Sequence, residues 1–269
     1  MLSRHRAVVV PSLVALLCAL PACSSAPADV AASPSATAAA TPTPEEAVGG
    51  TLTKDDFVRT ITDAFTAVGS YDFTVVLGTD GSLGEVSGSM HLGEVPSYDM
   101  TMAMVGMEMR MRAVDGTGYV SLGELTGGKF LAVDPSDASD PFAAAFADSV
   151  NQADPSMGLK EHEAAIVSVT AVGEPTDVDG VQVRTYEVLV DPRKMPERMA
   201  DLESSLPPGQ EIPETLAYTY LITADGLVRE VSYEILGIEG RMTTSNWGAA
   251  APVTAPGPDE ITTQEALGG

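Results

Sequence analysis

The chain has 269 residues, and its 38 acidic residues against 14 basic ones give a formal net charge of −24 at pH 7. Proteins that bind nucleic acids neutralise phosphates with clustered basic side chains, and this composition offers no such surface. Composition therefore excludes a nucleic-acid partner. An anionic membrane surface would not attract the protein electrostatically either.

The N-terminus has the order of a secretory signal. Arg4 and Arg6 precede an apolar run over residues 7–20, and small residues follow it. The run is shorter than the roughly 20 apolar residues that a membrane-spanning helix needs. We therefore expect residues 1–22 to be a signal peptide that is removed on export.

The end of this signal resembles the bacterial lipobox, in which a Cys is diacylated and becomes the new N-terminus. The matching sequence is Leu20-Pro21-Ala22-Cys23. We expect lipidation at Cys23, which would anchor the protein to the cell membrane on its extracytoplasmic side, because two or more acyl chains give stable attachment. Simple secretion after cleavage behind Ala22 or Ala28 is the alternative.

Three further segments follow the signal. Residues 23–50 are mostly Ala, Ser, Thr and Pro and are typical of a flexible tether behind the lipidated Cys. Residues 51–247 are long enough for one domain with a sizeable core, and residues 248–269 are expected to form an irregular tail. Because Cys18 is removed and Cys23 is acylated, the mature chain would have no disulfide.

The first half of the domain predicts one helix and a meander of six strands. A capping Thr53 precedes the apolar stripe of the helix, which Gly69 ends. Alternating or apolar stretches then predict strands at residues 71–77, 86–92, 98–104, 107–112, 119–122 and 129–133. Asp140-Pro141 predicts a second helix that carries Phe142, Phe146 and Val150 on one face.

Six methionines mark the centre of this meander. They alternate with polar residues on either side of Val105-Gly106, which we interpret as a two-residue hairpin loop. In that register Met104 faces Met107, and all six share one face: Met100, Met102, Met104, Met107, Met109 and Met111. The opposite face would carry Asp99, Thr101, Glu108, Arg110 and Arg112.

Three interpretations of the methionine strip stay open. Methionine is flexible and polarizable, so the strip could be an adaptable wall that contacts lipid, or it could be ordinary core beneath a helix. Thioethers also bind Cu(I), but His91 is the only histidine nearby.

The second half predicts strands at residues 166–172 and 181–190, joined by a turn over residues 173–180. A helix is expected from Asp191-Pro192 to about Ser204, and Pro207-Pro208-Gly209 breaks the chain. A hairpin around Asp225-Gly226 follows. Counting outward from Ala224 opposite Leu227 pairs Tyr220 with Val231, Tyr218 with Tyr233 and Leu216 with Ile235, which predicts a second apolar face. A last strand is expected at residues 241–246.

Several turns and strand edges resemble the LppX/LprAFG family of actinobacterial lipoproteins, with LolA-like proteins as more distant relatives. The resemblance rests on Arg112-Ala113-Val114-Asp115-Gly116, on Val172-Gly173-Glu174 with Val178-Asp179-Gly180-Val181, and on Asn246-Trp247-Gly248. It implies an α+β fold, in which helices pack on the concave face of a curved antiparallel β half-barrel. It also implies an apolar cavity that holds acyl chains of lipids or glycolipids in transit through the cell envelope.

We therefore expect a lipid-binding site on the sheet and no metal site. Its residues would be the six methionines together with Phe73, Val75, Tyr218, Tyr220, Val231 and Tyr233. A lipid or glycolipid would be the ligand, the membrane would be contacted through the acyl anchor, and an envelope lipid transporter is a candidate partner. The alternative is an envelope docking or sensing module with a filled core.

We expect neither enzymatic activity nor a cofactor. The mature chain has His91 and His162 but no Gly-x-Ser-x-Gly elbow, phosphate loop or paired metal-ligand motif. The acids Asp99, Glu108, Glu230 and Glu234 are expected on outward strand faces as solvated charge.

Overall fold

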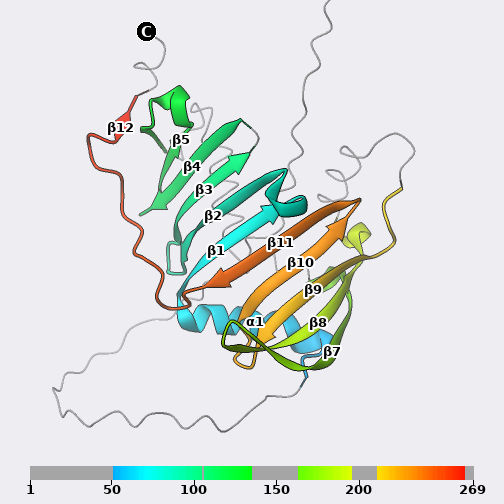
Figure 1. Cartoon of the computed structure of the whole chain (residues 1–269). Coiled ribbons are helices and arrows are strands. Elements are labelled where there is room, and N and C mark those ends of the chain that lie inside the picture. Colours follow the sequence, from blue (N-terminus) through cyan, green and yellow to red (C-terminus); the bar gives the residue numbers. More distant parts are fainter. Residues whose placement is uncertain (1–50, 105, 135–162, 196–210, 264–269) are drawn as a thin grey trace, which may run out of the picture.

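The computed structural model describes residues 51–104, 106–134, 163–195 and 211–263. They form a large open sheet, almost entirely antiparallel, with few helices (Figure 1). The expected signal, tether and Cys23 lie outside these residues, as do His162 and the helix predicted from Asp140. No helix in the described part is long and apolar enough to cross a bilayer.

Helix α1 (Lys54–Val68) begins and ends where the sequence predicts. Thr53 and Asp56 form a capping box, and Gly69 ends the helix in the left-handed region at φ 71°. These contacts satisfy backbone groups that a helix end leaves without partners. The buried side chains of the helix share one face: Phe57, Val58, Ile61 and Phe65.

The six-stranded meander is confirmed. Strands β1 to β6 lie in sequence order within the sheet: β1 (Ser70–Leu77), β2 (Gly84–His91), β3 (Ser97–Met104), β4 (Met107–Val114), β5 (Thr117–Ser121) and β6 (Phe130–Val133). Short 3₁₀ turns, η2 (Thr79–Gly81) and η3 (Gly123–Thr126), occupy two of the connections.

A second run of strands, from the other half of the chain, completes the sheet. It comprises β7 (Ile166–Val178), β8 (Val181–Val190), β9 (Leu216–Thr223), β10 (Val228–Ile235) and β11 (Ile238–Ser245). The two runs join where β1 pairs antiparallel with β11. A non-local seam therefore joins the two runs, and both halves contribute to a single surface.

The turn predicted over residues 173–180 is wrong for most of its length. Strand β7 continues to Val178, and only the two residues Asp179 and Gly180 separate it from β8. A register shift between Val172 and Thr176 accommodates Gly173 and Pro175. The strand tolerates Pro175 because it lies at the sheet edge, where proline breaks no ladder on its free side.

The turn of the second hairpin also differs from its prediction. Ala224 does not face Leu227, because Thr223 donates its backbone N–H to the Leu227 carbonyl over 2.8 Å. A bulge at Arg229 restores the predicted register, so Tyr220 faces Val231 and Tyr218 faces Tyr233. A bulge adds one residue to one strand and shifts its pairing by one.

Two further expectations concern a helix and the tail. The helix predicted from Asp191-Pro192 begins with a 3₁₀ turn, η4 (Pro192–Lys194), and the rest of the predicted helix, residues 196–204, lies outside the described residues. The tail is not wholly irregular, because β12 (Ile261–Thr262) pairs in parallel with β6. The C-terminal segment thus returns to the sheet.

Candidate functional site

The candidate site is the apolar face of the sheet, which the strand register makes continuous. Directly paired residues on neighbouring strands point to the same side. One row crosses nine strands without a polar side chain except the tyrosine hydroxyls: Met109, Met102, Val86, Val75, Met242, Val231, Tyr220, Tyr186 and Ala171. The two apolar faces predicted separately are therefore parts of one face.

The methionine hairpin has the predicted register. Met104 pairs with Met107, Met102 with Met109, and Met100 with Met111. Four of the six are partly buried and pack against the core: Met100, Met102, Met109 and Met111. Met104 is partly buried, whereas Met107 is 47% exposed at the tip of the hairpin. The structure therefore divides the strip into packed members and an exposed end.

The second hairpin lies farther along the face, with β8 and β7 beyond it, and is more completely buried. Tyr218, Val231 and Tyr233 are each less than a tenth exposed, and the Tyr218 and Tyr233 rings lie 5.5 Å apart between centroids. Tyr220 meets Phe57 of α1 edge-on at 5.2 Å. Burial raises the pKa of Tyr220 to about 12, because the packed surroundings cannot solvate a phenolate.

Helix α1 covers one part of this face. Phe65 contacts Tyr71 of β1 edge-on at 4.9 Å, while Phe57 reaches β9. The β9–β10 turn approaches α1 so closely that it requires a glycine, since a Cβ on Gly226 would lie 2.9 Å from Cγ2 of Thr60. The other two predicted site residues, Phe73 and Val75, are buried in β1, each 3% exposed.

Three glycines in the same face were missed by sequence reasoning. Gly84 and Gly88 pair with Met104 and Met100, and Gly240 pairs with Tyr233. The Tyr233 ring lies over Gly240, where a Cβ would come 2.1 Å from the ring. The sequence did contain a signal for them, because a glycine inside a strand pattern often marks a place where another group lies close to the backbone.

A polar group also lies in this face. Thr244, 1% exposed, pairs with Phe73 and donates its hydroxyl to the Val228 carbonyl. The same hydroxyl accepts the indole N–H of Trp247 over 2.9 Å. Both hydrogen-bond partners belong to the protein, so the Thr244 hydroxyl leaves no unsatisfied polar group at the apolar surface.

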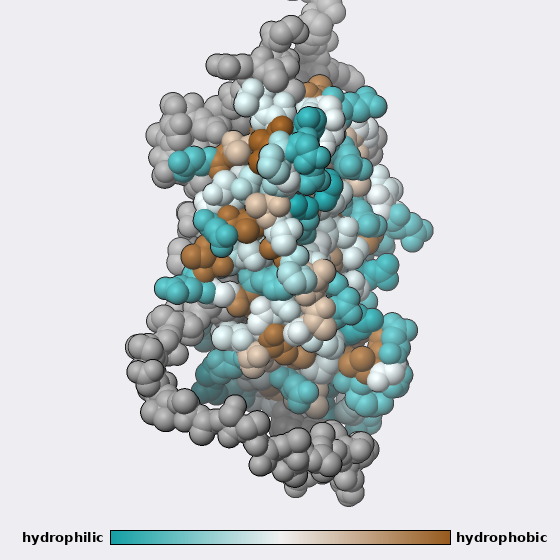
Figure 2. Space-filling view, turned by 90° about the vertical axis from the view of Figure 1, so that its left-hand side faces the viewer, coloured by the Kyte–Doolittle hydropathy of each residue, from teal (hydrophilic) through white to brown (hydrophobic). Residues whose placement is uncertain are grey.

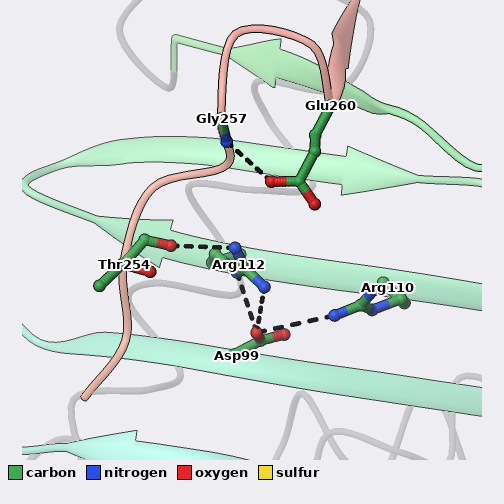
Figure 3. Close-up of polar contacts among 6 residues, drawn as sticks. All are labelled: Asp99, Arg110, Arg112, Thr254, Gly257 and Glu260. Atoms are coloured by element: carbon green, nitrogen blue, oxygen red, sulfur yellow. Dashed lines mark hydrogen bonds and ion pairs between the residues drawn. The ribbon is translucent and has the colours of Figure 1, made fainter.

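The opposite face is polar, but Asp99 is not simply solvated charge as predicted. Its carboxylate accepts two hydrogen bonds from Arg112 and lies 3.8 Å from Arg110 (Figure 3). Both guanidinium groups lie over the ring of Phe130, at 5.3 and 5.2 Å from its centroid. Sequence reasoning missed Phe130, because a 2% exposed aromatic on the polar face has no signal in strand alternation.

An open groove of about 600 Å³ also lies on the polar face, over β1, β9, β10 and β11. Its lining includes Glu230, Glu234, Glu239 and Arg241. A charged groove of this kind does not suit an acyl chain, which leaves the apolar face as the candidate lipid site. No group of three or more metal-ligating side chains occurs among the residues with described positions.

The chain matches no protein-family model and no curated protein. Among solved structures, LprF from Mycobacterium bovis is similar at 16% identity and a TM-score of 0.48, over 76% of this chain and 97% of that one. LppX from Mycobacterium tuberculosis gives 12% and 0.47, over 75% and 98%. MucB, solved with MucA(peri), gives 14% and 0.34, over 77% and 58%. These likenesses concern the arrangement of the strands and say nothing of a ligand or partner.

Proposed function

We propose that this protein is a membrane-anchored lipoprotein that holds acyl chains of a lipid or glycolipid against the apolar face and carries them within the cell envelope. The observation that carries the proposal is the apolar row across nine strands, which includes both the methionine hairpin (β3 and β4) and the second hairpin (β9 and β10). Each residue adds about 4.8 Å across the sheet, so the row is long enough for an extended acyl chain.

The different burial of the two hairpins supports binding of acyl chains of different shape. The second hairpin is packed beneath α1, where Phe57 meets Tyr220. The methionine hairpin is only partly buried at Met102 and Met109. Methionine side chains repack at low cost, so the methionine hairpin can adjust to acyl chains of different shape. Such binding uses dispersion and burial, so we propose a carrier without enzymatic activity or cofactor.

Lipid extraction and native mass spectrometry test this function. Full-length protein, purified gently from a host with a diacyl-lipid or glycolipid envelope, should carry adducts of lipid mass. It should also take up added lipid after delipidation. Protein without adducts that binds no added lipid would contradict the carrier, and would favour the docking or sensing module with a filled core.

A further inference from the structure

Tyr220 places a hydroxyl group in the apolar row at a point where the row is accessible. Its ring meets Phe57 of α1 edge-on, with 5.2 Å between centroids, and part of its surface stays exposed. Its neighbours in the row, Val231 and Tyr186, are 6% and 4% exposed. A ligand on the apolar face can therefore reach Tyr220, whereas packing covers Val231 and Tyr186.

The Tyr220 hydroxyl has no hydrogen-bond partner within the described part of the chain, and desolvation alone raises its pKa. Other hydroxyls of this face are used by the protein itself. That of Tyr186 accepts the Leu52 N–H over 3.3 Å, and that of Thr244 accepts the indole N–H of Trp247. A polar group without a partner in apolar surroundings costs free energy, which a ligand recovers by supplying the partner. The Tyr220 hydroxyl is therefore a candidate contact for a polar atom of a bound lipid.

The surroundings of this hydroxyl favour a neutral hydrogen-bond acceptor. Burial keeps the phenol of Tyr220 protonated at neutral pH, so it has an O–H to donate. The apolar row contains no basic side chain. A carboxylate or phosphate placed there would lose its hydration without gaining a counter-ion. The carbonyl oxygen of an acyl ester suits the site, because it is uncharged and adjoins an apolar chain.

From this arrangement we infer that the Tyr220 hydroxyl donates a hydrogen bond to an ester carbonyl of the bound lipid, so that the ligand is an ester-linked acyl lipid with its carbonyl held at β9. This inference rests on the carrier function proposed above. On one side of Tyr220 the row meets the buried Tyr186, whose hydroxyl is bonded to Leu52. On the other side it continues across β10, β11, β1 and β2 to the methionine hairpin. The acyl chain should therefore extend toward Met109.

The outer surface beside β12 and β5 offers the acyl chain no competing track. In Figure 2, which views the molecule from the left of Figure 1, hydrophobic residues are scattered among hydrophilic ones. The gain from burying apolar surface grows with the area that is covered, so isolated apolar residues hold an acyl chain poorly. The chain is therefore expected to stay on the apolar face.

A pair of lipids that differ only in the carbonyl tests this contact. Delipidated full-length protein is titrated with ester-linked phosphatidylcholine and with its ether-linked counterpart, which has the same headgroup and chain length but no carbonyl. Tyr220→Phe removes the hydroxyl and keeps the ring against Phe57. We expect this variant to bind the ester lipid roughly tenfold more weakly than the parent does, and the ether lipid nearly as well.

Tyr119→Phe is the matched control, because it removes a hydroxyl from the opposite face, where Tyr119 pairs with Arg112. It should bind both lipids like the parent. Infrared spectra of an ester lipid that is isotopically labelled at its carbonyls give a second readout. The carbonyl band should lie at lower wavenumber on the parent than on Tyr220→Phe, because a hydrogen bond weakens the C=O bond.

The outcomes separate this contact from the carrier function. If the parent binds both lipids, and Tyr220→Phe changes neither the ester affinity nor the carbonyl band, the inference fails while the carrier stands. An equal loss of affinity for both lipids would show that Tyr220 acts by packing, and would also overturn the inference. If the parent binds neither lipid, the carrier fails and the inference fails with it.

Discussion

Individual methionines in the strip have different surroundings and so differ in what they report. Met102 is partly buried and packs against the core, whereas Met107 is 47% exposed at the hairpin tip. A larger side chain at Met102 would occupy space beside the apolar face. A larger side chain at Met107 would extend mainly into solvent, so substitutions at the two positions form a matched pair.

We predict that Met102→Trp cuts lipid uptake and leaves the melting temperature nearly unchanged, because the indole fills space that an acyl chain would occupy. Met107→Trp should change neither. If the strip is closed core, Met102→Trp instead costs about 1 to 3 kcal/mol through strain and leaves lipid uptake as before. Lipid binding and thermal unfolding of both variants separate these outcomes.

Tyr220 gives a second prediction at this scale, in alkaline solution. Its pKa is raised to about 12 in the folded protein, against about 10 when unfolded. Between these values the folded state keeps a proton that the unfolded state has lost, so the free energy of unfolding falls as pH rises, by up to about 3 kcal/mol.

Denaturant unfolding at pH 9 and pH 11 checks this effect. Because other tyrosines also titrate, the comparison is with Tyr220→Phe, which keeps the ring against Phe57 but has no proton to lose. The variant should lose less stability than the parent between the two values. Equal losses in both proteins would show that Tyr220 titrates normally.

Among the elements, the C-terminal segment, residues 248–263, which we call the C-terminal strap, is joined to the sheet at several distinct points. His91 Nε2 lies 2.8 Å from the Ala251 carbonyl, Arg112 bonds Thr254, and β12 pairs with β6. The strap also lies beside the buried ring of Phe130 and the two arginines over it. Its removal would leave the β6 edge unpaired.

Truncation after Gly248 should therefore lower the melting temperature and produce higher oligomers, because an unpaired edge invites strand addition. Light scattering during thermal unfolding measures both effects. The conservative control is Thr254→Ala, which keeps the carbonyl that accepts from Arg112 and should behave like the parent. A truncated chain that is as stable and as monodisperse as the parent would contradict a structural role for the strap.

The elements also show what strand periodicity could and could not predict. The methionine register followed from period two and from Gly106, which lies at φ 78° in the loop. The bulge at Arg229 could not be predicted from the sequence. Its guanidinium donates to the Thr244 carbonyl and to Asp179, at 2.7 and 3.2 Å, and both partners are remote in sequence. Pairing of β1 with β11 was likewise hidden, because no local pattern specifies it.

For the whole molecule, the proposed N-terminal anchor would decide where the sheet acts. We predict that Cys23 is diacylated after removal of residues 1–22, from the lipobox-like sequence that precedes it. Intact-mass analysis of membrane-fraction protein should give the mature chain plus its acyl groups. A Cys23→Ser variant should leave the membrane fraction. Secreted protein with an unmodified terminus at Cys23 or at Asp29 would contradict the anchor.

The seam between β1 and β11 has a consequence for the order of events during folding. The apolar row crosses the seam at Val75 and Met242, which are far apart along the chain. Closing so long a loop is slow, so a chain that emerges from its N-terminus first forms the methionine meander well before its partner strands arrive. Until β11 docks, half of the apolar face stands beside an open edge. The nascent protein would thus need protection from aggregation at the stage when half of the proposed ligand surface is already formed.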